Sequence, residues 1–231
     1  ILVCSLACSG QKKKTEKPAA SVSGIPVAGV IPDLSDSALL DLVQKQTFRY
    51  FWDFAHPVSG LARERSNTSF AYGHETVTTG GTGFGIMAII VAVERKWITR
   101  DTAVKHLMKM VRFLEKSNRY HGVFPHWLNG ETGKTIPFSN NDDGGDLVET
   151  SYLIQGLLCA REYFNAQNPQ ESQLRARINW MWNDVQWSWH TRGGLSLLFW
   201  HWSPNNDWTM NHDIRGWNEC LITYILAAAS P

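Results

Sequence analysis

Four carboxyl side chains fall within eight residues of one another near the middle of this sequence. Asp142, Asp143, Asp146 and Glu149 end a polar, glycine-containing loop and open a run of apolar residues. Asp146 and Glu149 are three residues apart at the start of an expected helix, so they share a face. Because like charges this close repel, the cluster favours a bound ligand, a cation or a shared proton. A structural alternative accounts for Asp146 and Glu149, since Asp-x-x-Glu before an apolar run is also a helix capping box.

A fifth carboxyl, Glu219, stands at the start of another apolar run, two residues after Trp217 and directly before Cys220. We expect this carboxyl to be partly desolvated, which raises its pKa toward the value that a general acid needs near neutral pH. The alternative is a first-turn glutamate that interacts with the helix dipole.

Tryptophan is concentrated in one part of the chain, since eight of the 11 lie between residues 180 and 217. Indole rings suit sugars, whose flat C–H faces stack on aromatic surfaces. The residues that we expect to contact sugar in polar loops are His126, Trp127, Trp200, Trp202 and Trp208. Those on or just after an amphipathic helix, for which we expect a packing role, are Trp180, Trp182, Trp187 and Trp189.

Helix-forming segments of two kinds alternate along the chain. The amphipathic ones are residues 36–56, 100–116 and 171–188, and the ones that are apolar all round are residues 84–93, 146–164 and 217–229. This order predicts alternating outer and inner helices and an all-α fold, half of an (α/α)6 barrel, with a short β-hairpin at the rim over residues 195–200. Because an inner helix needs a covering neighbour, we expect the sequence to be a fragment truncated at its C-terminus.

Composition sets few further limits. The 231 residues are 43% hydrophobic with a formal net charge of +1, which suits a globular domain and gives no reason to expect nucleic acid as a partner. Cys159 and Cys220 lie in apolar helices, so we expect two buried thiols. The glycine-rich residues 80–85 match no nucleotide-binding motif, and we expect them to give the rim backbone freedom. We expect no metal and no cofactor.

The N-terminal residues are typical of an exported protein. Residues 1–8 read as the remnant of a signal peptide with a lipobox, which makes Cys8 the candidate for lipidation and membrane anchoring. An ordinary signal peptide is the alternative. Residues 9–34 are expected to form a flexible tether and residues 35–231 the catalytic domain. The predicted location is the periplasm, or the outer membrane of a Gram-negative bacterium as a lipoprotein.

Several longer motifs, in order, carry a resemblance to a known family. They are Phe51 to Gly60 with Arg63 to Asn67, Thr78 to Gly85, Phe124 to Trp127, Asp142 to Thr150, and Phe199 to Pro204. Residues 35–231 thereby resemble the bacterial glucoamylase-like family, which includes the endo-β-1,2-glucanases of glycoside hydrolase family 144. The resemblance implies an (α/α)6 barrel, export, and inverting hydrolysis of β-1,2-glucan.

The resemblance also implies roles for individual residues. The catalytic candidates are Glu219, as general acid, with Asp142, Asp146 and Glu149, which position a water or bind sugar hydroxyls. The substrate-binding candidates are Asp143, Arg65, His126, Trp127, Trp200, Trp202, Trp208 and Trp217, the last at a position where the family more often has Tyr. The general base stays open, because the family's barrel is longer than this sequence.

Three other interpretations remain at this point. The same aromatic residues suit a non-catalytic glycan-binding lipoprotein, and the same pocket suits a hydrolase of another glucan. In addition, Asp142 to Asp146 fit Asp-Asp-x-x-Asp, the magnesium-diphosphate motif of isoprenoid synthases. Dependence on magnesium would favour that third class.

Overall fold

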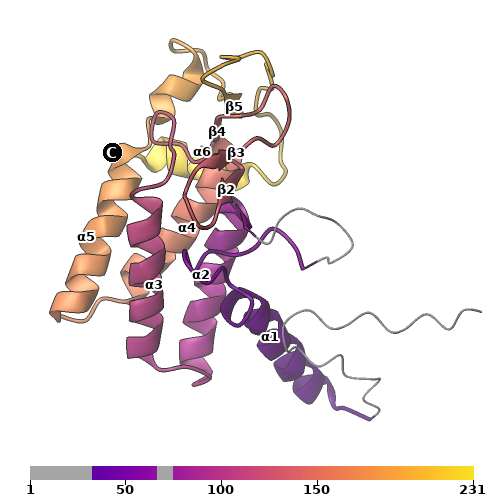
Figure 1. Ribbon diagram of the computed structural model, residues 1–231, viewed down its shortest axis with the longest axis vertical. Helices are drawn as coiled ribbons and strands as arrows, with labels where there is room; N and C mark the ends of the chain where they lie inside the picture. The colour runs from indigo at the N-terminus through magenta and orange to yellow at the C-terminus, as the bar shows by residue number, and fades with distance from the viewer. Residues whose placement is uncertain (1–32, 67–74) are drawn as a thin grey trace, which may run out of the picture. The chain divides into compact units, whose positions relative to one another are not determined.

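A computed structural model of the protein describes residues 33–66 and 75–231. About half of this part of the chain is helical, and it has a few short strands (Figure 1). Its helices are α1 (Asp36–Trp52), α2 (Thr79–Glu94), α3 (Arg100–Leu114), α4 (Leu147–Tyr163), α5 (Pro169–Asp184), the 3₁₀ helix η2 (Trp187–Thr191) and α6 (Leu221–Ala229). Its strands are β1 (Thr76–Thr78), β2 (Trp127–Asn129), β3 (Thr135–Ile136), β4 (Gly145–Asp146) and β5 (His201–Trp202). The expected signal remnant, most of the tether and Cys8 lie outside the described residues.

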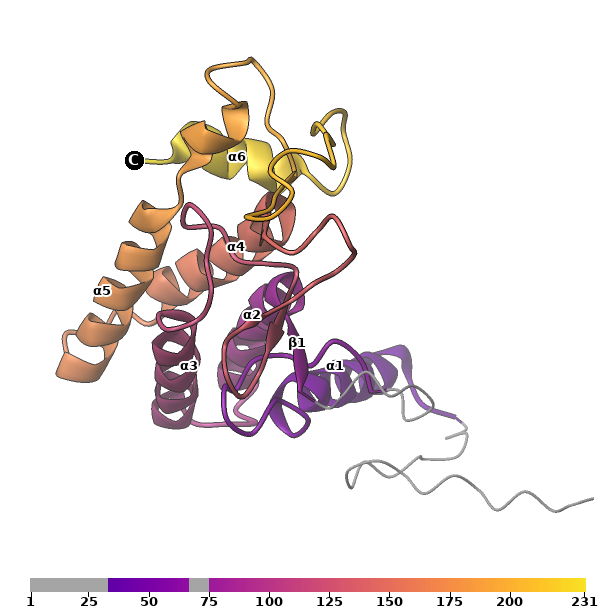
Figure 2. The same ribbon diagram turned by 45° about the horizontal axis from the view of Figure 1, so that its top comes forward.

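The helices form an inner row and an outer row. α2 and α4 pack side by side at the centre, α6 packs on α4, and α3 and α5 pack on each other and on the inner helices (Figures 1 and 2). α1 packs on α2. The predicted alternation of outer and inner helices is therefore confirmed for α2 to α5. Their core lies between the two rows around side chains such as Phe124, Leu153 and Phe164.

The outer helices α3 and α5 begin where the sequence places capping residues. The Thr99 hydroxyl accepts a hydrogen bond from the Thr102 amide at 3.2 Å, which caps α3. The Asn168 side chain accepts one from the Glu171 amide at 2.9 Å, and Pro169 follows as the first residue of α5. The buried Glu171 carboxylate then binds Arg100 of α3 through Nε at 2.8 Å, which ties the two outer helices together.

The glycine-rich segment lies within a helix, which corrects the expectation of a flexible rim. α2 begins at Thr79, so Gly80 and Gly83 belong to its first turns. A Cβ at Gly83 would collide with the backbone of Tyr152 in α4, and one at Gly156 of α4 would collide with the backbone of Gly83. The glycines are therefore needed for the close approach of α2 and α4 rather than for a turn.

The strands hold the loops at the ends of the inner helices. β1, β2 and β3 form an antiparallel sheet in which Val77 pairs with Leu128, and β1 leads directly into α2. β4 and β5 pair antiparallel, with Asp146 opposite His201, and β4 leads directly into α4. The hairpin expected over residues 195–200 is confirmed only in part. Phe199 forms an isolated antiparallel bridge with Asp213, and the strand that follows, β5, pairs with β4.

Two helices differ from the expected burial. α6 begins at Leu221 rather than at 217, and only Thr223 and Leu226 of this helix are buried. α1 ends at Trp52 rather than at 56, and Phe48 is its buried residue. Three apolar side chains in the first half of α1 are exposed: Leu39, Leu40 and Val43.

Candidate active site

Asp146, at the start of α4, is the centre of the carboxylate cluster. It is fully buried, and its Oδ1 accepts hydrogen bonds from the Glu149 amide at 2.9 Å and from Trp200 Nε1 at 2.8 Å. Its Oδ2 lies 3.0 Å from Nδ1 of His126. The expected cap on α4 is thus confirmed for Asp146. Because both oxygens are already engaged, Asp146 is suited to holding its neighbours in place.

Glu149 links the starts of two inner helices. Its Oε2 accepts a hydrogen bond from the Gly80 amide, in the first turn of α2, at 2.9 Å. The capping box is therefore only half formed, since Glu149 reaches α2 instead of returning to Asp146. Burial, followed by the negative charge of Asp146, raises the pKa of the Glu149 carboxyl. The charge of Glu219 adds to the same effect.

Asp142 is the carboxyl of the cluster that is best suited to hold a proton. Only 2% of it is exposed, and its Oδ2 lies 3.2 Å from Nδ1 of His201. Burial, followed by the charge of Asp146, raises its pKa from 3.8 to about 6, although His126 opposes the shift. A carboxyl with this pKa exchanges protons close to neutral pH, as acid–base catalysis requires.

His126 completes the hydrogen-bonded network on the side of β2. Burial disfavours its charged form. The hydrogen bond that protonated His126 donates to Asp146, together with the negative charge of Asp146, outweighs this effect, so that the pKa of His126 is raised. Its ring lies 4.2 Å from the ring of Phe138 and 5.6 Å from that of Trp127, measured between centroids. The predicted residues His126 and Trp127 are therefore brought to the cluster.

Trp200 stands at the opposite side, between two histidines that were not among the expected site residues. Its ring stacks on His201 at 5.6 Å and on His212 at 4.9 Å. Burial lowers the pKa of His201, despite the nearby charge of Asp146. The Trp200–His201–Trp202 motif offered a signal for His201, but the β4–β5 pairing that places it against Asp146 is too short to read from sequence.

Glu219 lies in the turn before α6, and the expectation that it is partly desolvated is wrong because its side chain is exposed. Its backbone carbonyl accepts a hydrogen bond from the Tyr152 hydroxyl at 2.8 Å. Burial, followed by the charge of Glu219, raises the pKa of Tyr152 to about 12. The charge of Glu219 contributes to the raised pKa values of both Glu149 and Tyr152. The Glu219 carboxylate therefore lies near the first turns of α4. Trp217 is 87% exposed.

The remaining predicted residues lie farther from Asp146 or have structural contacts. Asp143 binds the side chains of Asn205 and Asn206, which joins the loop before α4 to the loop after β5. Trp202 packs with Tyr120, His121 and Trp189, whereas Trp208 packs with Trp189, His190 and Phe199. Arg65 forms an ion pair with Glu64.

Other properties of the described residues bear on the alternatives. In residues 33–66 and 75–231, no group of three or more His, Cys, Asp and Glu side chains has the arrangement to hold a metal ion. Cys159 and Cys220 are free thiols, as expected, although only Cys220 is fully buried. In the same two ranges, every helix is too short or too polar to cross a membrane.

Several known proteins are similar to this chain in sequence and in structure. No family model matches the chain. An exo β-1,2-glucooligosaccharide sophorohydrolase (non-reducing end) from Parabacteroides distasonis is 48% identical over 200 residues, which are 86% of this chain and 27% of that protein. The structure of an endo-β-1,2-glucanase from Chitinophaga pinensis, in complex with sophorotriose and glucose, is 54% identical with a TM-score of 0.83. The match covers 86% of this chain and 48% of that one.

A third relative has the same fold. A β-1,2-glucanase structure from Parabacteroides distasonis is 48% identical with a TM-score of 0.81, over 86% of this chain and 28% of that one. The chain is therefore a homologue of β-1,2-glucan hydrolases of the glycoside hydrolase family 144 type, which confirms the resemblance seen in its motifs. It spans about half of the length of the Chitinophaga pinensis enzyme and less than a third of the two relatives from Parabacteroides distasonis.

Proposed function

We propose that this protein is a glycoside hydrolase that cleaves β-1,2-glucan, in an endo-acting and inverting manner. The observation that carries the proposal is the meeting of three inner-helix starts at one group of carboxyls, through Gly80 of α2, Asp146 and Glu149 of α4, and Glu219 before α6. The names of the relatives support the substrate. The endo-acting relative is 54% identical and the exo-acting one 48%, which supports endo action.

The proposed chemistry needs one carboxyl that donates a proton to the glycosidic oxygen and another that activates a water. Glu219 remains our proposed general acid, but the reason differs from the sequence argument. Because its side chain is exposed, the bound sugar rather than the protein must desolvate it and raise its pKa. Asp142 and Glu149, both with raised pKa values, then bind hydroxyls or position water, and Asp146 orients His126 and Trp200.

The proposed architecture and location follow the sequence. The alternating rows of helices, matched to the N-terminal half of longer relatives, support an (α/α)6 barrel in the complete protein. We also propose export, with a lipid on Cys8 as the membrane anchor. Incorporation of labelled palmitate that is lost in Cys8→Ser tests the anchor; unchanged labelling of that variant would contradict it.

The complete protein, incubated with a panel of glucans that includes β-1,2-, β-1,3-, β-1,4- and α-1,4-linked polymers, tests the function. We expect new reducing ends from the β-1,2-glucan alone, with short sophoro-oligosaccharides as early products. Release of a disaccharide from chain ends only would indicate exo action instead. Binding without any new reducing ends would show a glycan-binding protein and contradict the proposal.

A further inference from the structure

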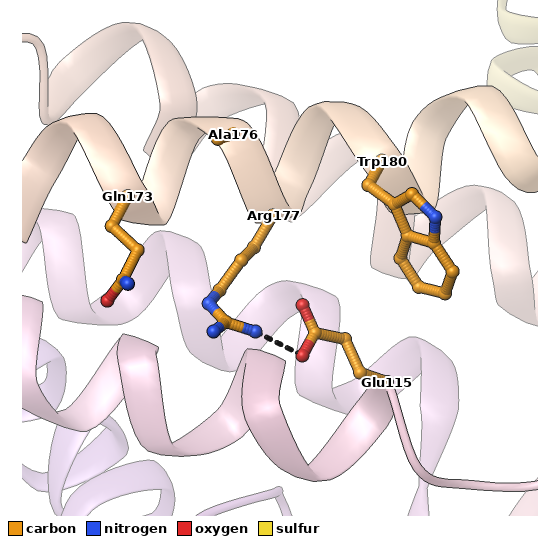
Figure 3. A pocket seen from close by; sticks show the side chains of 5 residues that line it. All are labelled: Glu115, Gln173, Ala176, Arg177 and Trp180. Carbon is orange, nitrogen blue, oxygen red and sulfur yellow. Dashed lines mark hydrogen bonds and ion pairs between the residues drawn. The ribbon is translucent and has the colours of Figure 1, made fainter.

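The outer helices α3 and α5 carry a groove that the proposed catalysis does not use. It has a volume of about 550 Å³ and is lined by Glu115, Gln173, Ala176, Arg177 and Trp180. Figure 3 shows Gln173, Arg177 and Trp180 projecting from one side of α5 toward α3, with Glu115 directly after the end of α3. All five side chains belong to the outer row, on the opposite side of α3 and α5 from the inner helices.

Trp180 offers a rigid aromatic surface in this groove. The sequence predicted a packing role for Trp180, but 46% of this residue is exposed, so that prediction is wrong. The Arg119 guanidinium lies 4.5 Å from the ring centroid and also pairs with Asp184, with Nη1 3.0 Å from Oδ2. Because Arg119 supports the ring, little side-chain freedom is lost when a ligand stacks on the exposed part.

The polar side chains beside Trp180 complement the hydroxyls of a sugar. Glu115 and Arg177 form an ion pair across the groove, as Figure 3 shows, and a carboxylate and a guanidinium together accept from and donate to neighbouring hydroxyls. Gln173 accepts from Arg112 at 3.2 Å, and its amide group can also donate. Ala176 also lines the groove, and its short side chain adds no polar group. An indole flanked by planar polar groups is the usual chemistry of carbohydrate recognition.

The groove is connected to the end of the molecule that carries the candidate active site. The Arg119 guanidinium that supports Trp180 also lies 5.6 Å from the ring centroid of Phe124. The Phe124 carbonyl accepts a hydrogen bond from the Asp146 amide at 2.8 Å. These contacts connect the Trp180 end of the groove to the carboxylate cluster.

From these contacts we propose that the groove between α3 and α5 is a second glucan-binding site, which holds a distant part of the same polymer that the active site cleaves. This inference rests on the proposed function for its ligand, a β-glucan chain. Such a site raises the affinity for long chains, because the second contact becomes intramolecular once the first has formed. It has no effect on oligosaccharides that are too short to reach both sites.

Native-gel retardation by β-1,2-glucan polymer, together with kinetics of the complete protein on polymer and on short sophoro-oligosaccharides, tests the proposal. We expect Trp180→Ala and Arg177→Ala to weaken retention and raise the KM for polymer about tenfold, the scale of one lost aromatic contact. Trp180→Phe should restore most of the affinity. Arg95→Ala is the matched control, since this exposed arginine pairs with Asp41 of α1 and does not line the groove. The kcat on short substrates should be unchanged in all four variants.

Failure of the groove and failure of the function give different results. If Trp180→Ala keeps the wild-type retention and KM and hydrolyses β-1,2-glucan normally, the proposal of a binding site in the groove is wrong. The proposed function is then unaffected. A loss of kcat on short substrates would also overturn the binding site in the groove, because a structural role then explains the variant. Retention of a different glucan that depends on Trp180, without hydrolysis of β-1,2-glucan, would support the groove and overturn the function.

Discussion

The Oε2 atom of Glu149 lies 2.9 Å from the backbone nitrogen of Gly80, and this contact joins the first turn of α4 to the first turn of α2. A carboxylate at this point is stabilised by the positive end of the α2 dipole and by an amide that the helix itself leaves unpaired. The same residue is affected by the charges of Asp146 and Glu219. The site is therefore assembled from the starts of several helices, and its parts depend on the spacing of α2 and α4.

Because α2 and α4 lie so close together, adding one methyl group at their contact is predicted to destabilise the fold. Gly83→Ala places a Cβ against the Tyr152 backbone of α4, so the helices must separate, and we expect a loss of about 2 kcal/mol in the free energy of unfolding. Gly81→Ala is the control within the same helix, because its Cβ meets only the Thr78 side chain. Urea unfolding of the two variants measures the difference. Equal stability of both would contradict the close packing of α2 on α4.

Asp146 is predicted to be the main structural residue of the site. Asp146→Ala removes the α4 cap and leaves Trp200 Nε1 and His126 without their buried partner, so we expect a loss of roughly 3 kcal/mol in the free energy of unfolding. Asp143→Ala, which removes contacts only to Asn205 and Asn206, should cost less than about 1 kcal/mol. Calorimetric or denaturant unfolding compares them. A smaller loss for Asp146→Ala than for Asp143→Ala would contradict this assignment.

Asp142 is predicted to make the stability depend on pH. Its pKa is raised in the folded protein, so the native state binds a proton more tightly than the unfolded state, and stability falls as the pH rises from 3.8 to about 6. Asp142→Asn removes this effect and should increase the free energy of unfolding at pH 7 by up to about 3 kcal/mol. At pH 3 we expect the two proteins to be nearly equally stable.

Thermal unfolding of both proteins at several values from pH 3 to pH 7 checks this prediction. Glu149 and His126 also have raised pKa values, and the causes found for Glu149 do not include Asp142. The charge of Asp142 contributes to the raised pKa of His126, so the comparison measures Asp142 together with its coupling to His126. A variant that is less stable than the parent at pH 7 would show that the Asp142 carboxylate is stabilised by its surroundings, contrary to the burial seen here.

Much of the helical framework could be predicted because burial leaves a clear mark on sequence. The apolar segments of residues 84–93 and 146–164 became buried inner helices, and the caps at Thr99 and Asp146 formed as expected. The glycines before Phe84 were misread, because glycine marks both a flexible loop and a place where two helices touch, and only the position of α4 decides between them.

The site was predictable in its residues but not in its environments. Sequence placed the acids at helix starts, and the structure gathers Asp142, Asp146 and Glu149 there. The sequence predicted that Glu219 is desolvated, but Glu219 is exposed and Asp142 is the buried carboxyl. Burial of a loop residue depends on which distant segment covers it, here the β5 region with His201, and no local pattern specifies that partner.

Hydrolysis by Glu219→Gln is the most direct test of the central claim, that the starts of α2, α4 and α6 form one glycoside-hydrolysing site. In the complete protein, we expect the variant to keep its fold and its affinity for β-1,2-glucan but to lose at least about 100-fold of the rate at which new reducing ends appear. The isosteric Gln removes the proton and the charge and leaves the shape. Turnover at the wild-type rate in this variant would contradict the account.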